Sequence, residues 1–249
     1  MKTLRFVLTT AVLCAAEHAA STQILPDRPF VLGSTYWGGP GTEDYTAIAT
    51  DAAGNAYVAV GGADVVVSKF DPAGRLVSVA AYGGSGAEAV TAVAVDAIGR
   101  VVIAGRTISP DLPLVNPIQP AFHAAGCGEF GGICSDGFVA RIDPSTSQVS
   151  FATYLGTAAG QDTVTDVAVD ATNNIFVTGE VVGAFDNGVP VRPAAGGSDA
   201  FVATIPQAGG VFTYLTYLGG SFEDRLTWSS ACGFTASAPA TYRNSGSAH

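Results

Sequence analysis

The sequence predicts an all-β fold built from repeated units of four antiparallel strands. Turns are frequent, because 31 Gly and 13 Pro occur in 249 residues. The apolar segments between the turns are short and rich in β-branched residues, which favours strands over helices. The same order of segments occurs three times along the chain, and this self-similarity is the main indication of the fold.

Each unit contains four segments in a constant order. The first is an apolar strand that ends in Asp: TAIATD (46–51), TAVAVD (91–96) and TDVAVD (165–170). The second is a strand that ends in Gly: AYVAVG (56–61), VVIAG (101–105) and IFVTG (175–179). The third begins with Asp: DVVVSKFDP (64–72), DGFVARIDP (136–144) and DAFVATIPQ (199–207). The fourth leads to a Tyr before the next Gly-containing turn: Tyr36, Tyr82, Tyr154 and Tyr217.

A four-stranded unit with two apolar faces buries both only by stacking on its neighbours, as β-propeller blades do. We expect blades at about 37–82, 83–154 and 155–217, within a propeller region at 30–226. A β-sandwich is the rival fold, but it does not require the same order of strands three times. Residues 227–249 lose the pattern and are expected to form an irregular tail. Three complete blades and a partial one favour an open arc, from a truncated or frame-shifted propeller.

The units differ mainly in the loop between their second and third strands. That loop has two residues in the first unit (62–63), but it spans 106–135 in the second and 180–198 in the third. Insertions at one position of a repeat lie on one rim of the assembly, which is often the binding rim. The longer loop includes a proline-rich stretch, ISPDLPLVNPIQPAF, which we expect to be extended and semi-rigid.

Residues 1–20 have the layout of a secretory signal peptide. Lys2 and Arg5 precede a short apolar run, and small residues follow it. We therefore predict a secreted or cell-surface protein; a buried N-terminal helix is the alternative. Export permits disulfides, and Cys127 and Cys134 are predicted to form one. A pair of metal thiolates is the alternative for these two residues, and Cys232 has no evident partner.

Charge and composition exclude several functions. The net charge is −10 at pH 7, so the chain cannot supply the dense basic face of a nucleic-acid-binding protein. Its apolar run is too short for a stable membrane span. Histidine is nearly absent, and only His123 lies near the predicted fold, so no Ser-His-Asp arrangement can be built. We therefore expect no catalytic residues, although an enzyme is not excluded.

Acidic residues recur with the repeat. Asp51, Asp96 and Asp170 end the first strand of each unit, and they are weak candidates for a Ca²⁺ site because calcium prefers several oxygen ligands. The structural interpretation is that Asp accepts hydrogen bonds from nearby backbone N–H groups in tight turns. Two further sets of acidic residues recur with the repeat and are open to the same two interpretations. They are Glu43, Asp44, Glu88, Asp162, Glu223 and Asp224 after the Gly-containing turn, and Asp64, Asp136 and Asp199 at the start of the third strand.

Aromatic and glycine residues recur as well. We expect the repeated Tyr side chains, together with Phe70, Phe138 and Phe201, to pack between blades rather than to bind a ligand. The glycine pairs are expected to serve turns that need a positive φ. These pairs are Gly38-Gly39, Gly83-Gly84 and Gly219-Gly220.

The segments DGFVARIDP, FATYLG, TDVAVD, NNIFVTG and SPDLPLVNPIQPAF together resemble the bacterial SBBP repeat, a repeat of seven-bladed β-propellers. The resemblance covers about residues 33–224 and implies an exported or cell-surface propeller without a catalytic motif. We therefore expect a non-enzymatic binding or structural module that recognises an extracellular protein or glycan and carries no cofactor. The alternative is a Ca²⁺-binding propeller or a propeller hydrolase that uses rim carboxylates. Open blade edges would also allow self-association.

Overall fold

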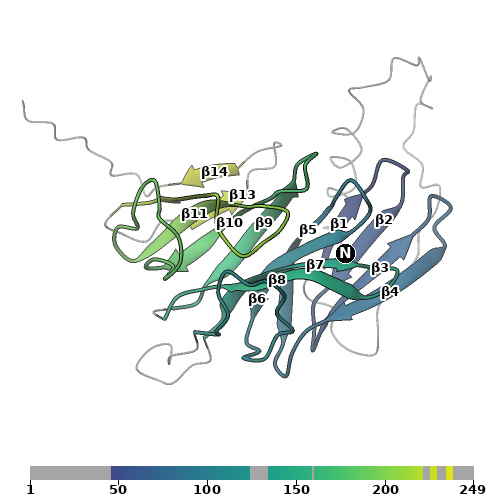
Figure 1. Cartoon of the computed structure of the whole chain (residues 1–249), viewed down its shortest axis with the longest axis horizontal. Coiled ribbons are helices and arrows are strands. Elements are labelled where there is room, and N and C mark those ends of the chain that lie inside the picture. Colours follow the sequence, from purple (N-terminus) through teal and green to yellow (C-terminus); the bar gives the residue numbers. More distant parts are fainter. Residues whose placement is uncertain (1–45, 124–133, 159, 221–224, 229–233, 238–249) are drawn as a thin grey trace, which may run out of the picture. The chain divides into compact units, whose positions relative to one another are not determined.

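The structure, a computed structural model, describes residues 46–123, 134–158, 160–220, 225–228 and 234–237 (Figure 1). Strands, turns and irregular connections make up all of these residues. Within these ranges no helix is long and apolar enough to cross a membrane. The predicted all-β fold is confirmed, and the twelve strands of its three larger sheets all lie within the compact unit Gly38–Thr227.

Each of the three larger sheets is an antiparallel meander of four consecutive strands, as expected for a blade. Blade 1 contains β1 (Thr46–Thr50), β2 (Ala56–Val60), β3 (Val65–Phe70) and β4 (Leu76–Tyr82). Blade 2 contains β5 (Glu88–Val95), β6 (Val101–Thr107), β7 (Asp136–Asp143) and β8 (Gln148–Leu155). Blade 3 contains β9 (Thr163–Val169), β10 (Ile175–Val182), β11 (Ser198–Ile205) and β12 (Tyr214–Leu218).

A fourth, smaller sheet pairs β13 (Arg225–Trp228) with β14 (Phe234–Ser237). The structure differs here from the irregular tail expected at 227–249. Both segments do alternate apolar and polar residues, as RLTW and FTAS, but each is only four residues long and falls outside the repeated order of strands on which the prediction relied.

The blades stack in chain order, each covering one face of the next. In β6 of blade 2, Val101 and Ile103 belong to the core shared with blade 1, whereas Val102 and Ala104 belong to the core shared with blade 3. Successive strand residues point to opposite faces, so one strand contributes to both cores. The hydroxyl of Thr91 in β5 also donates to the carbonyl of Val164 in β9, at 2.5 Å. Blade 2 is thus buried on both faces.

The repeated aromatic residues lie in these cores, with one correction in blade 1. Tyr154 pairs with Phe138 and Tyr217 with Phe201, and all four are buried. Tyr82 instead pairs with Val65. The equivalent pair in blade 2 is that of Leu155 with Gly137. Tyr82 is therefore not the counterpart of Tyr154, although its ring stacks on Phe138 of blade 2 with centroids 6.1 Å apart. Phe70 is only half-buried, and Tyr36 lies outside the described residues.

Candidate binding rim

The three candidate calcium ligands lie in equivalent turns, where each carboxylate accepts hydrogen bonds from its own turn. Asp51 Oδ1 accepts from the backbone N–H groups of Ala53 and Asn55, at 3.0 and 2.9 Å. Asp170 Oδ1 accepts from those of Thr172 and Asn174, at 2.9 and 2.8 Å. This is the turn chemistry expected for Asp at strand ends.

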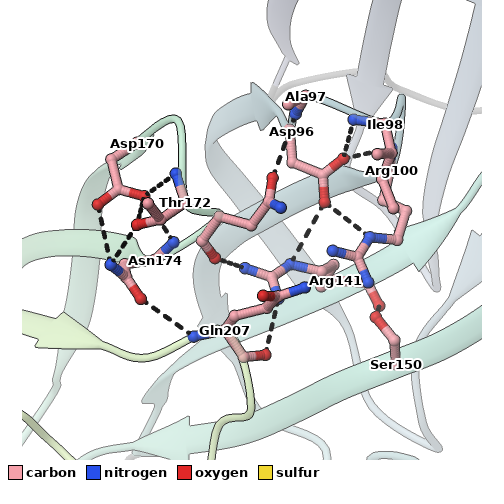
Figure 2. Close-up of polar contacts among 11 residues, drawn as sticks. Asp96, Ala97, Ile98, Arg100, Arg141, Ser150, Asp170, Thr172, Asn174 and Gln207 are labelled. Atoms are coloured by element: carbon pink, nitrogen blue, oxygen red, sulfur yellow. Dashed lines mark hydrogen bonds and ion pairs between the residues drawn. The ribbon is translucent and has the colours of Figure 1, made fainter.

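Asp96 makes the same turn contacts and in addition holds two arginines (Figure 2). Its Oδ2 lies 2.7 Å from Arg100 Nε and 3.8 Å from Arg141 Nε. The Arg141 guanidinium donates onward to the carbonyls of Gln207 and Asn173 in blade 3, at 3.0 and 2.5 Å. Burial, and then the charge of Arg100, lower the pKa of Arg141. This network ties blade 2 to blade 3.

Each of the three aspartates is thus engaged by its own turn or by arginine. The residues that the structure describes contain no group of three or more His, Cys, Asp or Glu side chains arranged to hold a metal ion. The Ca²⁺ site at Asp51, Asp96 and Asp170 stays a prediction.

At the opposite rim, an aspartate at the start of the third strand anchors each insertion loop. The insertion loops are residues 108–135, between β6 and β7, and 183–197, between β10 and β11. Asp136 Oδ2 accepts from the His123 N–H and from Gln119 Nε2, both at 2.9 Å. Asp199 Oδ2 accepts from the N–H of Ala195 at 2.7 Å. Both aspartates are buried, so these contacts fix the loops to the blades.

A second buried carboxylate lies at the same rim, at the start of the first strand of blades 2 and 3. Glu88, the first residue of β5, accepts from the hydroxyls of Thr107 and Ser109. Asp162, just before β9, accepts from the N–H groups of Thr157 and Val182, at 2.5 and 2.9 Å. Burial raises the pKa of Glu88 and raises that of Asp162 to about 6.

Two glycines at this rim, Gly83 and Gly156, are required by close approach rather than by backbone conformation. A Cβ on Gly156 would lie 2.3 Å from Asp136 Cγ, and one on Gly83 would lie 2.2 Å from Asp64 Oδ1. The prediction of positive φ was wrong for Gly83-Gly84 and Gly219-Gly220, because their φ values lie outside that region. Gly38-Gly39 lies outside the described residues.

Both insertion loops return to the outer strand of their own blade. Val115 exchanges backbone hydrogen bonds with Ala152 in β8, at 2.9 and 3.2 Å. In blade 3, the Val191 N–H donates to the carbonyl of Leu215 at 2.8 Å, and the N–H of Tyr217 donates to the carbonyl of Arg192 at 3.2 Å. Each loop therefore satisfies backbone groups that an edge strand leaves unpaired.

The two loops also contact each other. The Asn187 side chain donates to the carbonyl of Ile118 at 2.9 Å, and His123 Nε2 lies 3.6 Å from Asp186 Oδ2. A shallow depression lies between the loops, lined partly by Phe185 and Phe212, and it encloses essentially no volume that a water-sized molecule could occupy. Small-molecule sites usually enclose roughly 300–1,000 Å³. The contacts bring the predicted loops together as one surface, which we call the insertion rim (described residues 108–123 and 183–197).

Cys134 is disulfide-bonded. Cys127 and Cys232 lie outside the described residues, as does the segment 1–20 predicted to be a signal peptide. The pairing of Cys127 with Cys134 therefore stays a prediction.

Sequence reasoning missed the pairing of the loops with the outer strands. Strand prediction relies on runs of several residues, and these pairings involve only one or two residues each. One feature does repeat: Val115-Asn116-Pro117 and Val191-Arg192-Pro193 both have the pattern Val-x-Pro.

Comparison with known proteins identifies the repeat. Residues 151–180, which include β9 and parts of β8 and β10, match the family model of the SBBP β-propeller repeat. The chain thus carries an SBBP β-propeller repeat, which confirms the resemblance. One similar solved structure is that of a protein of unknown function from Bacteroides caccae, 11% identical over 69% of this chain and 71% of that one, with a TM-score of 0.21. No curated protein matches the chain.

Proposed function

We propose that the chain is an exported bacterial propeller protein that binds an extracellular protein or glycan through its insertion rim, without a chemical step. One observation carries the proposal: buried carboxylates fix both insertion loops to the blades, and the loops contact each other. A surface held in this way loses little conformational entropy when it binds a ligand. It also presents groups for contact, because Val189 is 92% exposed and the side chain of Asp186 is 79% exposed.

Two features support the export part of the proposal. Residues 1–20 have the order of positive, apolar and small residues that secretory signals share. Cys134 is disulfide-bonded, and disulfides persist mainly in oxidising compartments outside the cytosol. A secreted or cell-surface location accounts for both.

The chemistry of the rim favours binding over catalysis. The carboxylates of Asp136, Asp162 and Asp199 accept hydrogen bonds from backbone N–H groups, which is a structural role. The depression between the loops is smaller than usual substrate sites. A ligand would therefore contact the rim as a surface rather than enter a cleft.

The test compares two exposed apolar residues on opposite rims. Val189 lies on the insertion rim, and Ile98, which is 70% exposed, lies in the turn that follows Asp96. The full chain and its Val189→Asp and Ile98→Asp variants are applied to arrays of extracellular proteins and oligosaccharides, and the dissociation constant of each captured ligand is measured. We expect Val189→Asp to weaken binding about tenfold or more and Ile98→Asp to leave it unchanged. Loss confined to Ile98→Asp, or no saturable binding across the arrays, would overturn the proposal.

A further inference from the structure

The three blades differ in what covers the outer edge of their last strand. In blades 2 and 3 an insertion loop pairs with β8 or β12, at Ala152 and Leu215 respectively. These two residues occupy the same register position. Ala152 pairs with Ala140 and Leu215 with Ala203, and each of these partners lies four residues after the aspartate that begins the third segment.

The same rule identifies the equivalent residue in blade 1. Four residues after Asp64 is Ser68, which pairs with Val79 in β4. Outside the β-bulge at Val77, backbone groups of alternate strand residues point to the same side, so Val79 and Ala81 direct their N–H and carbonyl groups toward the outer edge. Val79 thus takes the place of Ala152 and Leu215.

Among the described residues, none covers the edge at Val79 by backbone pairing. The loop between β2 and β3 in blade 1 is too short to return to β4. No backbone hydrogen bond reaches Val77, Val79 or Ala81 from the described part of the chain beyond the β3–β4 ladder. Val77 is 55% and Val79 46% exposed. An exposed apolar edge of this kind is a template for pairing with another strand.

The two covering segments indicate which sequence suits such an edge. Val115 and Val191 each donate their N–H to the equivalent carbonyl of the outer strand, that of Ala152 or Leu215. A proline follows two residues later in both, at Pro117 and Pro193. Valine favours the extended conformation, and proline keeps its own residue extended while it offers no N–H for continued pairing. The common pattern is therefore Val-x-Pro, in which the valine pairs with the edge; in blade 2 the middle residue, Asn116, is left-handed, with φ 48°.

We propose that the outer edge of β4 binds a Val-x-Pro segment of a partner protein by β-augmentation, with the Val N–H of the partner donating to the carbonyl of Val79. In this pairing, a segment of the partner makes the backbone hydrogen bond to the outer strand that an insertion loop makes in blades 2 and 3. The β4 edge is a second binding surface, which goes beyond the ligand proposed for the insertion rim and does not depend on it.

The first experiment uses the chain's own covering segment as a probe. A fluorescein-labelled peptide with the sequence of residues 112–120, LPLVNPIQP, is titrated with the full-length chain, and its anisotropy is measured. We expect saturable binding. The same peptide with an N-methylated valine lacks the donating N–H, so we expect it to bind about tenfold more weakly.

Two variants at one position locate the bound peptide. Val79→Pro removes the outward N–H but no bond of the β3–β4 ladder, since proline is tolerated on the outer side of an edge strand. Val79→Thr retains the N–H and is the matched control. We expect Val79→Pro to weaken peptide binding about tenfold or more, and Val79→Thr to leave it within twofold, with both variants melting close to the parent chain.

Three results would overturn the proposal. One is the absence of saturable binding at millimolar peptide. Another is equal binding of the peptide to the parent chain and Val79→Pro. The third is concentration-dependent dimerisation that Val79→Pro abolishes, because it would assign the edge to a second copy of the chain. Val189→Asp should leave peptide binding unchanged, so failure of this proposal is distinguishable from failure of the insertion-rim proposal.

Discussion

At the scale of single residues, aspartate has two roles in this chain, and burial separates them. Asp170 caps an exposed turn; although desolvation acts to raise it, hydrogen bonds from Asn174 and Thr172 hold its pKa below the ordinary value. Asp162 is fully buried, and desolvation raises its pKa to about 6. The two residues occupy different positions of the repeat, but the sequence pattern does not show which of these positions is buried.

The buried role of Asp162 predicts a dependence of stability on pH. The unfolded carboxyl titrates near 3.8 and the folded one near 6, so the folded state keeps its proton between these values. As pH rises from about 4 to 7, the parent chain should therefore lose stability relative to Asp162→Asn, whose side chain does not titrate. We expect a change on the order of 2 kcal/mol in their difference, measured from urea unfolding. A difference that stays constant over this pH range would contradict the assignment.

At the scale of elements, the strands could be predicted from the sequence, but their connections could not. The apolar segment predicted at 46–51 is β1, and the one at 165–170 contains most of β9. Alternating apolar residues determine such strands locally. The return of the insertion loops to β8 and β12 depends instead on contacts between residues far apart in the chain, as between Val115 and Ala152. Periodicity carries no information on these contacts.

The turn that follows β8 offers a test of close packing. A Gly156→Ala substitution would bring a Cβ within 2.3 Å of Asp136 Cγ, so either the turn or the loop anchor must move. We expect the free energy of unfolding to fall by about 1–3 kcal/mol. Gly62→Ala is the matched control, because its nearest atom would be the Asp64 carbonyl oxygen at 3.7 Å, and its effect should be within about 0.5 kcal/mol. Equal losses for the two substitutions would refute the packing argument.

At the scale of the whole molecule, one repeated sheet accounts for both the stability and the proposed binding of the chain. Blade 2 contributes the two faces of one sheet to separate cores, with Val101 on one side and Val102 on the other. The resemblance to the SBBP repeat and the blade architecture followed from the repeat itself. The difference between blade 1 and the other blades could be noted in the sequence as a short loop, but its consequence for the β4 edge required the register of β3 and β4.

Hydrogen exchange of the full-length chain, followed amide by amide, compares all three outer edges in one measurement. The amides of Ala152 and Tyr217 donate to Val115 and Arg192, so we predict that they exchange slowly. Within the part of the chain that the structure describes, the amides of Val79 and Ala81 have no such partner; they should exchange at least a hundredfold faster, then slow when the Val-x-Pro peptide is added. Slow exchange at Val79 without peptide, or fast exchange at Ala152, would contradict the account.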